Sequence, residues 1–249
     1  MKRTLELMCG TFGAGRPKIC VPIVDREGEG ILRSAERIAR LPADLVEWRA
    51  DFCGELLEER FLLEMLEGLR RRLGKKTILY TMRTKGEGGE LSADADTYFR
   101  LNRAAAASGF AELVDVEAFF AGERTGREIR AIQEAGSRVI ASFHNFDRTP
   151  GREEMVNRLL RMEELGADVA KLAVMPECPQ DVLELLEATA EADRRLEIPV
   201  VTMSMGKLGA VSRVSGTLTG SAMTFASAGD VSAPGQIPIE RMTEIMDVL

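Results

Sequence analysis

The stretch Asp168-Val-Ala-Lys171-Leu-Ala-Val-Met-Pro176 guides the interpretation of the whole chain. Its bounded apolar run is typical of a short strand buried on both faces, as in a parallel sheet, that ends in a Met-Pro turn. The central lysine is unusual, because a buried ammonium group without a partner is costly and tends to lose its proton. A neutral lysine in a closed site is a nucleophile that forms Schiff bases with ketones. For this residue alone, a lysine that reaches water or pairs with a carboxylate is the better interpretation.

The length and composition are those of a globular protein with a substantial core. The 249 residues match the usual size of an eight-fold βα barrel, with 45% hydrophobic and 29% charged residues. The net charge of -7 argues against nucleic acid or an anionic membrane surface as the main partner. No apolar run is long enough to span a membrane, and the first residues do not resemble a signal peptide. We therefore expect a cytoplasmic protein.

The cysteines and the single histidine offer little material for a metal site. Cys9, Cys20, Cys53 and Cys178 are scattered without a Cys-x-x-Cys pair, and His144 is the only histidine. We expect no zinc site, and reduced thiols in a reducing compartment.

Strand-like and helix-like segments alternate along the chain. Residues 5–16 contain three glycines but no following Gly-Lys-Ser/Thr, so they predict a turn or hairpin and not a phosphate-binding loop. The strand candidates are residues 19–24, 44–49, 77–83, 112–117, 138–144, 169–174, 199–204 and 221–226. Between them, apolar residues recur at helical spacing, as at Leu62, Met65, Leu66 and Leu69.

This alternation demands parallel strand pairing with crossover connections. The sequence therefore predicts one (β/α)8 TIM barrel that occupies residues 1–249 as a single catalytic domain, with a short N-terminal hairpin or turn. A doubly wound sheet is the alternative, but the first strand is not followed by a Gly-x-Gly-x-x-Gly turn.

Charged residues collect where these strands end, which is where barrel enzymes carry their active sites. The candidates are Glu47, Arg49, Arg83, Glu87, Asp115, Glu117, His144 and Lys171. A structural ion pair is the commoner role for each one alone, and Asp115 and Glu117 could simply neutralise neighbouring arginines. Together, cations and carboxylates predict a site for a small polar anion.

Several motifs lie in order along these strand ends. They are Glu47-Trp-Arg49, Arg83 with Glu87-Gly-Gly-Glu90, Asp115-Val-Glu117, Ser142-Phe-His144 with Thr149-Pro150, Lys171-Leu-Ala-Val-Met-Pro176, Thr202-Met-Ser-Met205, Ser212-Arg213 and Ser232-Ala-Pro-Gly-Gln236. In their order and spacing, over nearly the whole chain, the sequence resembles the type I 3-dehydroquinate dehydratases. The resemblance implies dehydration of 3-dehydroquinate to 3-dehydroshikimate in the shikimate pathway of aromatic amino acid biosynthesis, without a cofactor, by a homodimer.

The resemblance also implies a role for each matching residue. Lys171 would form the imine, His144 would be the general acid–base, and Glu87 would support the histidine. The implied substrate contacts are Glu47, Arg49 and Arg83 to ring hydroxyls, Arg213, Ser232 and Gln236 to the carboxylate, and Met203, Met205 and Phe225 to the ring. Pro22, Phe143 and Asn145 depart from the family pattern and bear on histidine orientation and carboxylate binding.

The chemistry explains these residue types independently. A protonated imine at C3 is a better electron sink than a ketone, and histidine titrates near neutrality, so it can both take the C2 proton and protonate the departing hydroxyl. The composition of residues 226–235 is typical of a mobile loop that closes over a substrate. Two alternatives remain: a class I aldolase acting on a small keto acid or on a sugar phosphate held at residues 206–220, and a catalytically silent barrel that serves as a binding module. An intact pair of His144 and Lys171 argues against the silent barrel.

Overall fold

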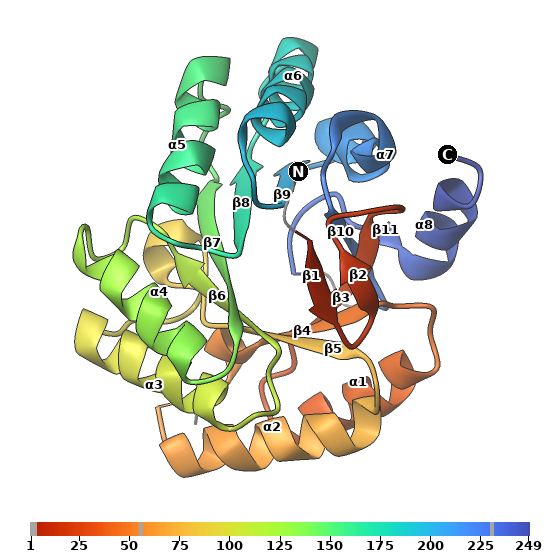
Figure 1. Cartoon of the computed structure of the whole chain (residues 1–249). Coiled ribbons are helices and arrows are strands. Elements are labelled where there is room, and N and C mark those ends of the chain that lie inside the picture. The colour runs from red at the N-terminus through yellow and green to blue at the C-terminus, as the bar shows by residue number, and fades with distance from the viewer. Residues whose placement is uncertain (1–3, 55–56, 230–231) are drawn as a thin grey trace.

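The computed structural model describes residues 4–54, 57–229 and 232–249, and its centre is a curled parallel sheet (Figure 1). Each long strand of the described chain pairs in parallel with the next one in sequence, and β10 returns to pair with β3. The strands are β3 (Lys18–Ile23), β4 (Leu45–Arg49), β5 (Thr77–Thr81), β6 (Leu113–Glu117), β7 (Arg138–Asn145), β8 (Val169–Val174), β9 (Val200–Ser204) and β10 (Met223–Ser227). The two-residue β11 (Ile237–Pro238) pairs with the end of β10.

The two edges of this sheet meet between β9 and β10. Val200 forms a bridge with Ser221, and the Ala222 N–H donates to the Val200 carbonyl at 2.8 Å. The predicted TIM barrel is therefore confirmed, and the predicted strands agree with the observed ones to within a few residues at each end.

Helices surround the sheet because each has one apolar face. They are α1 (Gly28–Ala39), α2 (Glu59–Leu73), α3 (Ala95–Ala107), α4 (Arg124–Glu134), α5 (Arg152–Glu164), α6 (Pro179–Arg195), α7 (Gly216–Thr219) and α8 (Ile239–Met246), with short 3-10 segments η1 (Ala50–Phe52), η2 (Lys85–Glu87) and η3 (Leu208–Arg213). In α2, Leu62, Leu66 and Leu69 are fully buried against the outer face of the strands. This helix ends at Gly74, whose φ of 59° suits a residue without a Cβ. No helix of the described ranges is long and apolar enough to cross a membrane.

Strand alternation divides the core into two layers. Residues such as Trp48 and Tyr80 face the helices, whereas Leu45, Leu79 and Val169 face the inside of the barrel. The predicted N-terminal hairpin is present as β1 (Leu5–Leu7) and β2 (Gly10–Phe12), which pair antiparallel.

This hairpin completes the inner apolar layer at one end of the barrel. Leu5 and Phe12 are buried in the inner cluster, and the Cys9 N–H donates to Thr77 Oγ1 at 3.1 Å, at the beginning of β5. Inward positions near the strand beginnings are therefore filled by apolar side chains, and the polar inward positions lie near the strand ends.

Candidate active site

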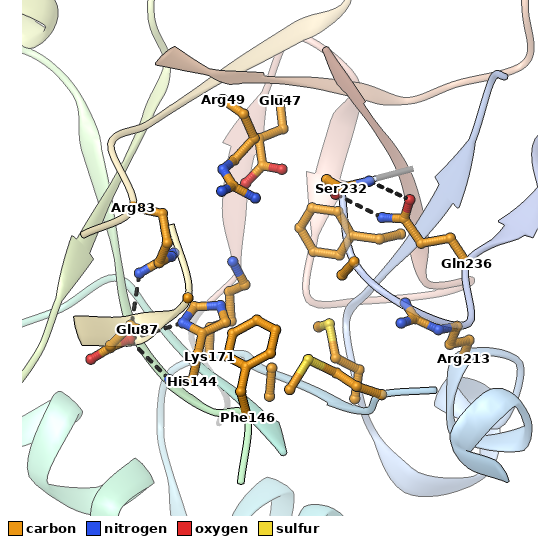
Figure 2. A pocket seen from close by; sticks show the side chains of 16 residues that line it. Glu47, Arg49, Arg83, Glu87, His144, Phe146, Lys171, Arg213, Ser232 and Gln236 are labelled. Carbon is orange, nitrogen blue, oxygen red and sulfur yellow. Dashed lines mark hydrogen bonds and ion pairs between the residues drawn. The ribbon is translucent and has the colours of Figure 1, made fainter. Parts of the chain in front are cut away.

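The carboxyl ends of the strands surround a cavity (Figure 2). Every residue to which the sequence resemblance gave a role lines it: Glu47, Arg49, Arg83, Glu87, His144, Lys171, Met203, Met205, Arg213, Phe225, Ser232 and Gln236. The sequence analysis missed Gly88, Phe146, Ala173 and Ala233, which also line the cavity. The structure thus brings the predicted residues together at the predicted end of the barrel.

Lys171 occupies an inward position in the middle of β8, and its side chain is 4% exposed. Its Nζ lies 3.0 Å from Asp115 Oδ2 on β6 and 5.0 Å from the centre of the Phe225 ring. Of the interpretations of this lysine, pairing with a carboxylate is the one observed, because Asp115 reaches Nζ from two strands away. Burial raises the pKa of Asp115, but Arg83, Lys171 and Ser142 outweigh burial and lower it to about 2. Asp115 is thus ionised and forms a buried ion pair with Lys171.

Arg83 bridges the carboxylates of Asp115 and Glu117 through hydrogen bonds. Its Nη2 donates to Asp115 Oδ1 at 2.7 Å, and its Nη1 donates to Glu117 Oε1 at 3.2 Å and to Ser142 Oγ at 2.9 Å. Burial lowers the pKa of Arg83, but the attraction of Asp115, Glu117 and Glu87 raises it overall. Asp115 and Glu117 lie outside the cavity lining and hold the cations of the site in place.

Glu87 holds His144 through two contacts (Figure 2). Its Oε2 lies 2.9 Å from His144 Nδ1 and accepts the His144 backbone N–H at 2.9 Å. Arg83 Nη1 is 3.5 Å from the same oxygen. The histidine ring is thereby fixed in orientation with Nδ1 toward the carboxyl group, which leaves Nε2 as the ring nitrogen for chemistry.

Burial shifts the pKa values of Glu87 and His144 in opposite directions. It raises the pKa of Glu87 to about 8, and nearby Glu117 and Asp115 add to the rise while Arg83 opposes it. Burial lowers the pKa of His144 well below its ordinary 6.5, with contributions from Arg83, Lys171 and Arg49. The pair therefore keeps a proton on Glu87 at neutral pH, and loss of that proton near pH 8 leaves an ionised Glu87, Nδ1–H and an unprotonated Nε2.

The unusual neighbours of His144 do not disturb its ring. Phe143 lies on the opposite face of β7, where its ring meets Phe119 edge-on at 5.6 Å and the Arg158 guanidinium at 4.1 Å. The Asn145 side chain accepts the backbone N–H groups of the next turn at 2.9 and 3.0 Å. In β3, Pro22 is buried in register with Glu47.

Arg213 lies across the cavity in η3 and is 2% exposed. Its Nη2 donates to the Pro234 carbonyl at 2.9 Å, and its Nε and Nη1 are buried without a partner among the described residues. Burial lowers the pKa of Arg213 to about 10. A buried guanidinium with two unused donors is suited to bind an anion such as a carboxylate.

The segment beside Arg213 is held against the cavity. The Ser232 N–H donates to Gln236 Oε1 at 3.1 Å, and Gln236 Nε2 donates to Ser232 Oγ at 2.9 Å (Figure 2). Gly235 has a φ of +79°, and a Cβ there would lie 2.1 Å from the Gly206 carbonyl oxygen, so only glycine allows this approach. Part of the predicted mobile loop, residues 230–231, lies outside the described residues.

Phe146 and Gly88 form a part of the lining that motif reasoning missed. The 38% exposed Phe146 side chain packs on Gly88, where a Cβ would lie 2.3 Å from the ring. An exposed aromatic residue two positions after the histidine and a pair of glycines after Glu87 were the available signals. Among the described residues, no group of three or more His, Cys, Asp or Glu side chains is arranged to hold a metal ion.

A (β/α)8 barrel with a buried lysine on β8, a histidine on the preceding strand β7 and a carboxyl group from η2 beside that histidine has the architecture of barrel enzymes that use a lysine nucleophile. Residues 19–249 match the family model of type I 3-dehydroquinase, and the chain belongs to this family.

Relatives and solved structures support this assignment along nearly the full length. The chain is 44% identical to a 3-dehydroquinate dehydratase of Klebsiella pneumoniae, with 96% of each chain covered. It is 42% identical to one of Listeria monocytogenes, over 96% of this chain and 95% of the relative. The structure of 3-dehydroquinate dehydratase from Geobacillus kaustophilus superimposes with a TM-score of 0.96 at 40% identity and covers 100% of this chain and 98% of the other. A type I enzyme structure from Clostridium difficile, described with covalently modified comenic acid, gives the same TM-score, identity and coverage.

Proposed function

We propose that this chain dehydrates 3-dehydroquinate to 3-dehydroshikimate through a Schiff base on Lys171, as a step of the shikimate pathway. One observation supports this above the others: the cavity combines the Lys171 amine with the Arg213 guanidinium, whose Nε and Nη1 have no partner among the described residues. This arrangement fits a small substrate that carries both a ketone and a carboxylate. The names of the relatives at 42–44% identity point to the same substrate.

The reaction begins with the transfer of the Lys171 proton. Asp115 accepts a hydrogen bond from Nζ at 3.0 Å, but its pKa of about 2 makes it a weak base. The pair of Glu87 and His144, with a pKa of about 8 on Glu87, is the better acceptor in the cavity once it is deprotonated. The freed amine adds to the C3 carbonyl, and loss of water gives the protonated imine.

Elimination then needs one acid–base group. The imine draws electrons from the C2–H bond while His144 Nε2 takes the C2 proton and an enamine forms. The enamine expels the C1 hydroxyl, which receives that proton from His144 and leaves as water. Hydrolysis of the conjugated imine releases the product and restores the Lys171 amine.

The remaining lining residues bind and orient the ring. Glu47, Arg49 and Arg83 contact ring hydroxyls, with Glu47 already held by Thr81 Oγ1 at 2.9 Å. Arg213, Ser232 and Gln236 receive the carboxylate. Met203, Met205 and Phe225 pack on the ring faces, where their buried apolar side chains also exclude water from the imine.

Borohydride reduction during turnover tests the proposal. We expect the mass of the reduced adduct on Lys171, together with the absorbance of a conjugated enone from 3-dehydroquinate. Lys171→Ala should lose both signals, with a drop in turnover of about 10⁴-fold or more, and should stay folded because Asp115 keeps Arg83 and Ser142. Labelling of Lys85 or Lys207 with Lys171 unmodified would refute the assignment.

The same cavity argues against the aldolase alternative. Arg213 offers a guanidinium for a planar carboxylate, and the helix that follows in residues 206–220 has only four residues, Gly216–Thr219. The family match and the relatives named as dehydratases point the same way.

The proposal also covers the organisation of the protein. Residues 1–249 would act as one catalytic domain, in a homodimer located in the cytoplasm. The exposed apolar side chains of Leu183, Val211 and Leu218 on α6, η3 and α7 are available for a subunit contact, and the thiols of Cys9, Cys20 and Cys178 are free, as a reducing compartment maintains them. Light scattering of the purified protein should give twice the chain mass of 27.4 kDa.

A further inference from the structure

The segment after β5 that carries Glu87 is fastened at both ends by buried carboxylates outside the cavity lining. At its beginning, Glu117 accepts the Thr84 N–H and the Thr84 Oγ1–H, both at 2.7 Å. At its end, Asp51 Oδ2 accepts the Glu90 N–H at 3.1 Å. The segment is thus a short loop that carries Glu87, and the carboxylates of Glu117 and Asp51 fix the positions of its two ends.

Asp51 also holds Arg49 through two parallel hydrogen bonds. Arg49 Nε donates to Oδ1 and Arg49 Nη2 donates to Oδ2, each at 2.8 Å. The Asp51 side chain is fully buried and that of Arg49 is 9% exposed. The guanidinium also lies over the Phe52 ring, at 4.8 Å from its centre. These contacts use Nε and Nη2, so Nη1 of Arg49 remains available to donate a hydrogen bond into the cavity that the residue lines.

We propose that Asp51 is a positioning residue for the reaction, because one carboxylate sets both the orientation of Arg49 and the place of the loop that carries Glu87. The proposal rests on the proposed function, in which Arg49 binds the substrate and Glu87 supports His144. A carboxylate is needed because three donors converge on two oxygens. An asparagine would offer one acceptor oxygen and turn an N–H₂ group toward a donor.

Glu112 provides a matched control at the opposite end of the barrel. Its carboxylate accepts Arg70 Nη2 at 2.6 Å and the Ile78 N–H at 2.7 Å, so it joins an arginine to a backbone N–H as Asp51 does. It lies before β6 and does not line the cavity. Glu112→Gln therefore carries the same chemical change without a connection to the site.

The experiment compares Asp51→Asn with Glu112→Gln by steady-state kinetics on 3-dehydroquinate and by hydrogen exchange of residues 84–91. We expect Asp51→Asn to raise KM about tenfold to a hundredfold, as for loss of a hydrogen bond to a charged group, and to speed exchange in this loop. Glu112→Gln should change neither. A native KM and native exchange in Asp51→Asn would overturn the proposal.

A double-mutant cycle with Arg49→Ala separates a direct effect from an effect through Arg49. If Asp51 acts through Arg49, Asp51→Asn should raise KM much less in the Arg49→Ala background. Equal increases in both backgrounds would overturn this part. Should Asp51→Asn fail to fold, Asp51→Glu keeps the charge but moves it by one methylene, and a native KM and native loop exchange in that variant would count against the proposal.

The exchange measurement does not depend on turnover. If the native chain fails to convert 3-dehydroquinate, the proposed function fails, while faster loop exchange in Asp51→Asn and not in Glu112→Gln still supports the placement of the loop by Asp51.

Discussion

Two walls of the cavity differ in how completely the protein satisfies their polar groups. The lysine wall, made of Arg83, Glu87, His144 and Lys171, is tied by hydrogen bonds to Asp115, Glu117 and Ser142. The arginine wall, made of Arg213, Ser232 and Gln236, includes a buried guanidinium with two nitrogen donors, Nε and Nη1, that lack a partner among the described residues. The protein itself supplies hydrogen-bond partners for the charged groups of the lysine wall. In the proposed reaction, the substrate supplies the partners that the arginine wall lacks.

This difference follows from what each wall does in the proposed reaction. Groups that transfer protons or form bonds must be held in one geometry, which a connected network provides. A group that binds a charged ligand gains most when its donors are not already used, because the ligand then replaces a missing partner instead of displacing one. We therefore assign the buried polar groups with hydrogen-bond partners to catalysis, and the buried guanidinium with unused donors to substrate binding.

After Lys171→Ala, the largest effect within this comparison is expected for His144→Ala on the lysine wall. Turnover should fall about 10²–10⁴-fold, which is typical for loss of a general acid–base group. Imine formation is a separate step, so borohydride should still fix substrate on Lys171. A loss of less than tenfold would exclude His144 as the base and make Glu87 the candidate.

On the arginine wall, Arg213→Ala should affect binding and not chemistry. We expect KM to rise about tenfold to a hundredfold, because a charge-assisted contact to the substrate carboxylate is lost. The melting temperature should change little, because the variant also removes a buried cation that has no carboxylate partner among the described residues. An unchanged KM would show that Arg213 is structural, and Arg213→Lys should recover only part of the affinity.

Glu87→Gln should move the pH profile of the lysine wall. In the native enzyme, kcat/KM should fall as pH drops below about 8, since protonation of Glu87 removes the unprotonated Nε2. Without this carboxyl group His144 titrates alone, and its lowered pKa moves the same fall below pH 6.5. Profiles of kcat/KM against pH for the native enzyme and Glu87→Gln test this direction. A fall at the same pH in both enzymes would contradict the prediction.

The smallest effect is expected for Ser232→Ala on the arginine wall. The variant removes the acceptor for Gln236 Nε2 while the Ser232 N–H still holds Gln236 Oε1. Loss of one neutral hydrogen bond corresponds to a KM increase of about two- to tenfold. A larger increase would mean that the hydroxyl contributes more to carboxylate binding than one neutral hydrogen bond, and Ser232→Thr should then restore binding.

Much of this molecule follows from local sequence patterns. Short bounded apolar runs predicted the strands, because a strand of a parallel sheet is buried on both faces and needs apolar side chains on each. Lys171, His144 and Arg83 were placed at one end of the barrel because parallel strands present their carboxyl ends on the same side. The ends of elements were less well predicted: the third predicted strand runs to residue 83, whereas β5 ends at Thr81.

The partners of the charged residues were decided by the tertiary structure. Nothing local in Asp168–Pro176 shows that Asp115 lies 3.0 Å from Lys171, or that Arg213 is left with two unused donors. The opposite shifts of Glu87 and His144 likewise depend on how deeply the packed chain buries both groups. Apolar runs and strand ends are properties of a single segment, so the sequence determines them directly. The burial of a charged side chain and the choice of its partner depend on segments far apart in the chain. Only the closed barrel brings those segments within hydrogen-bonding distance.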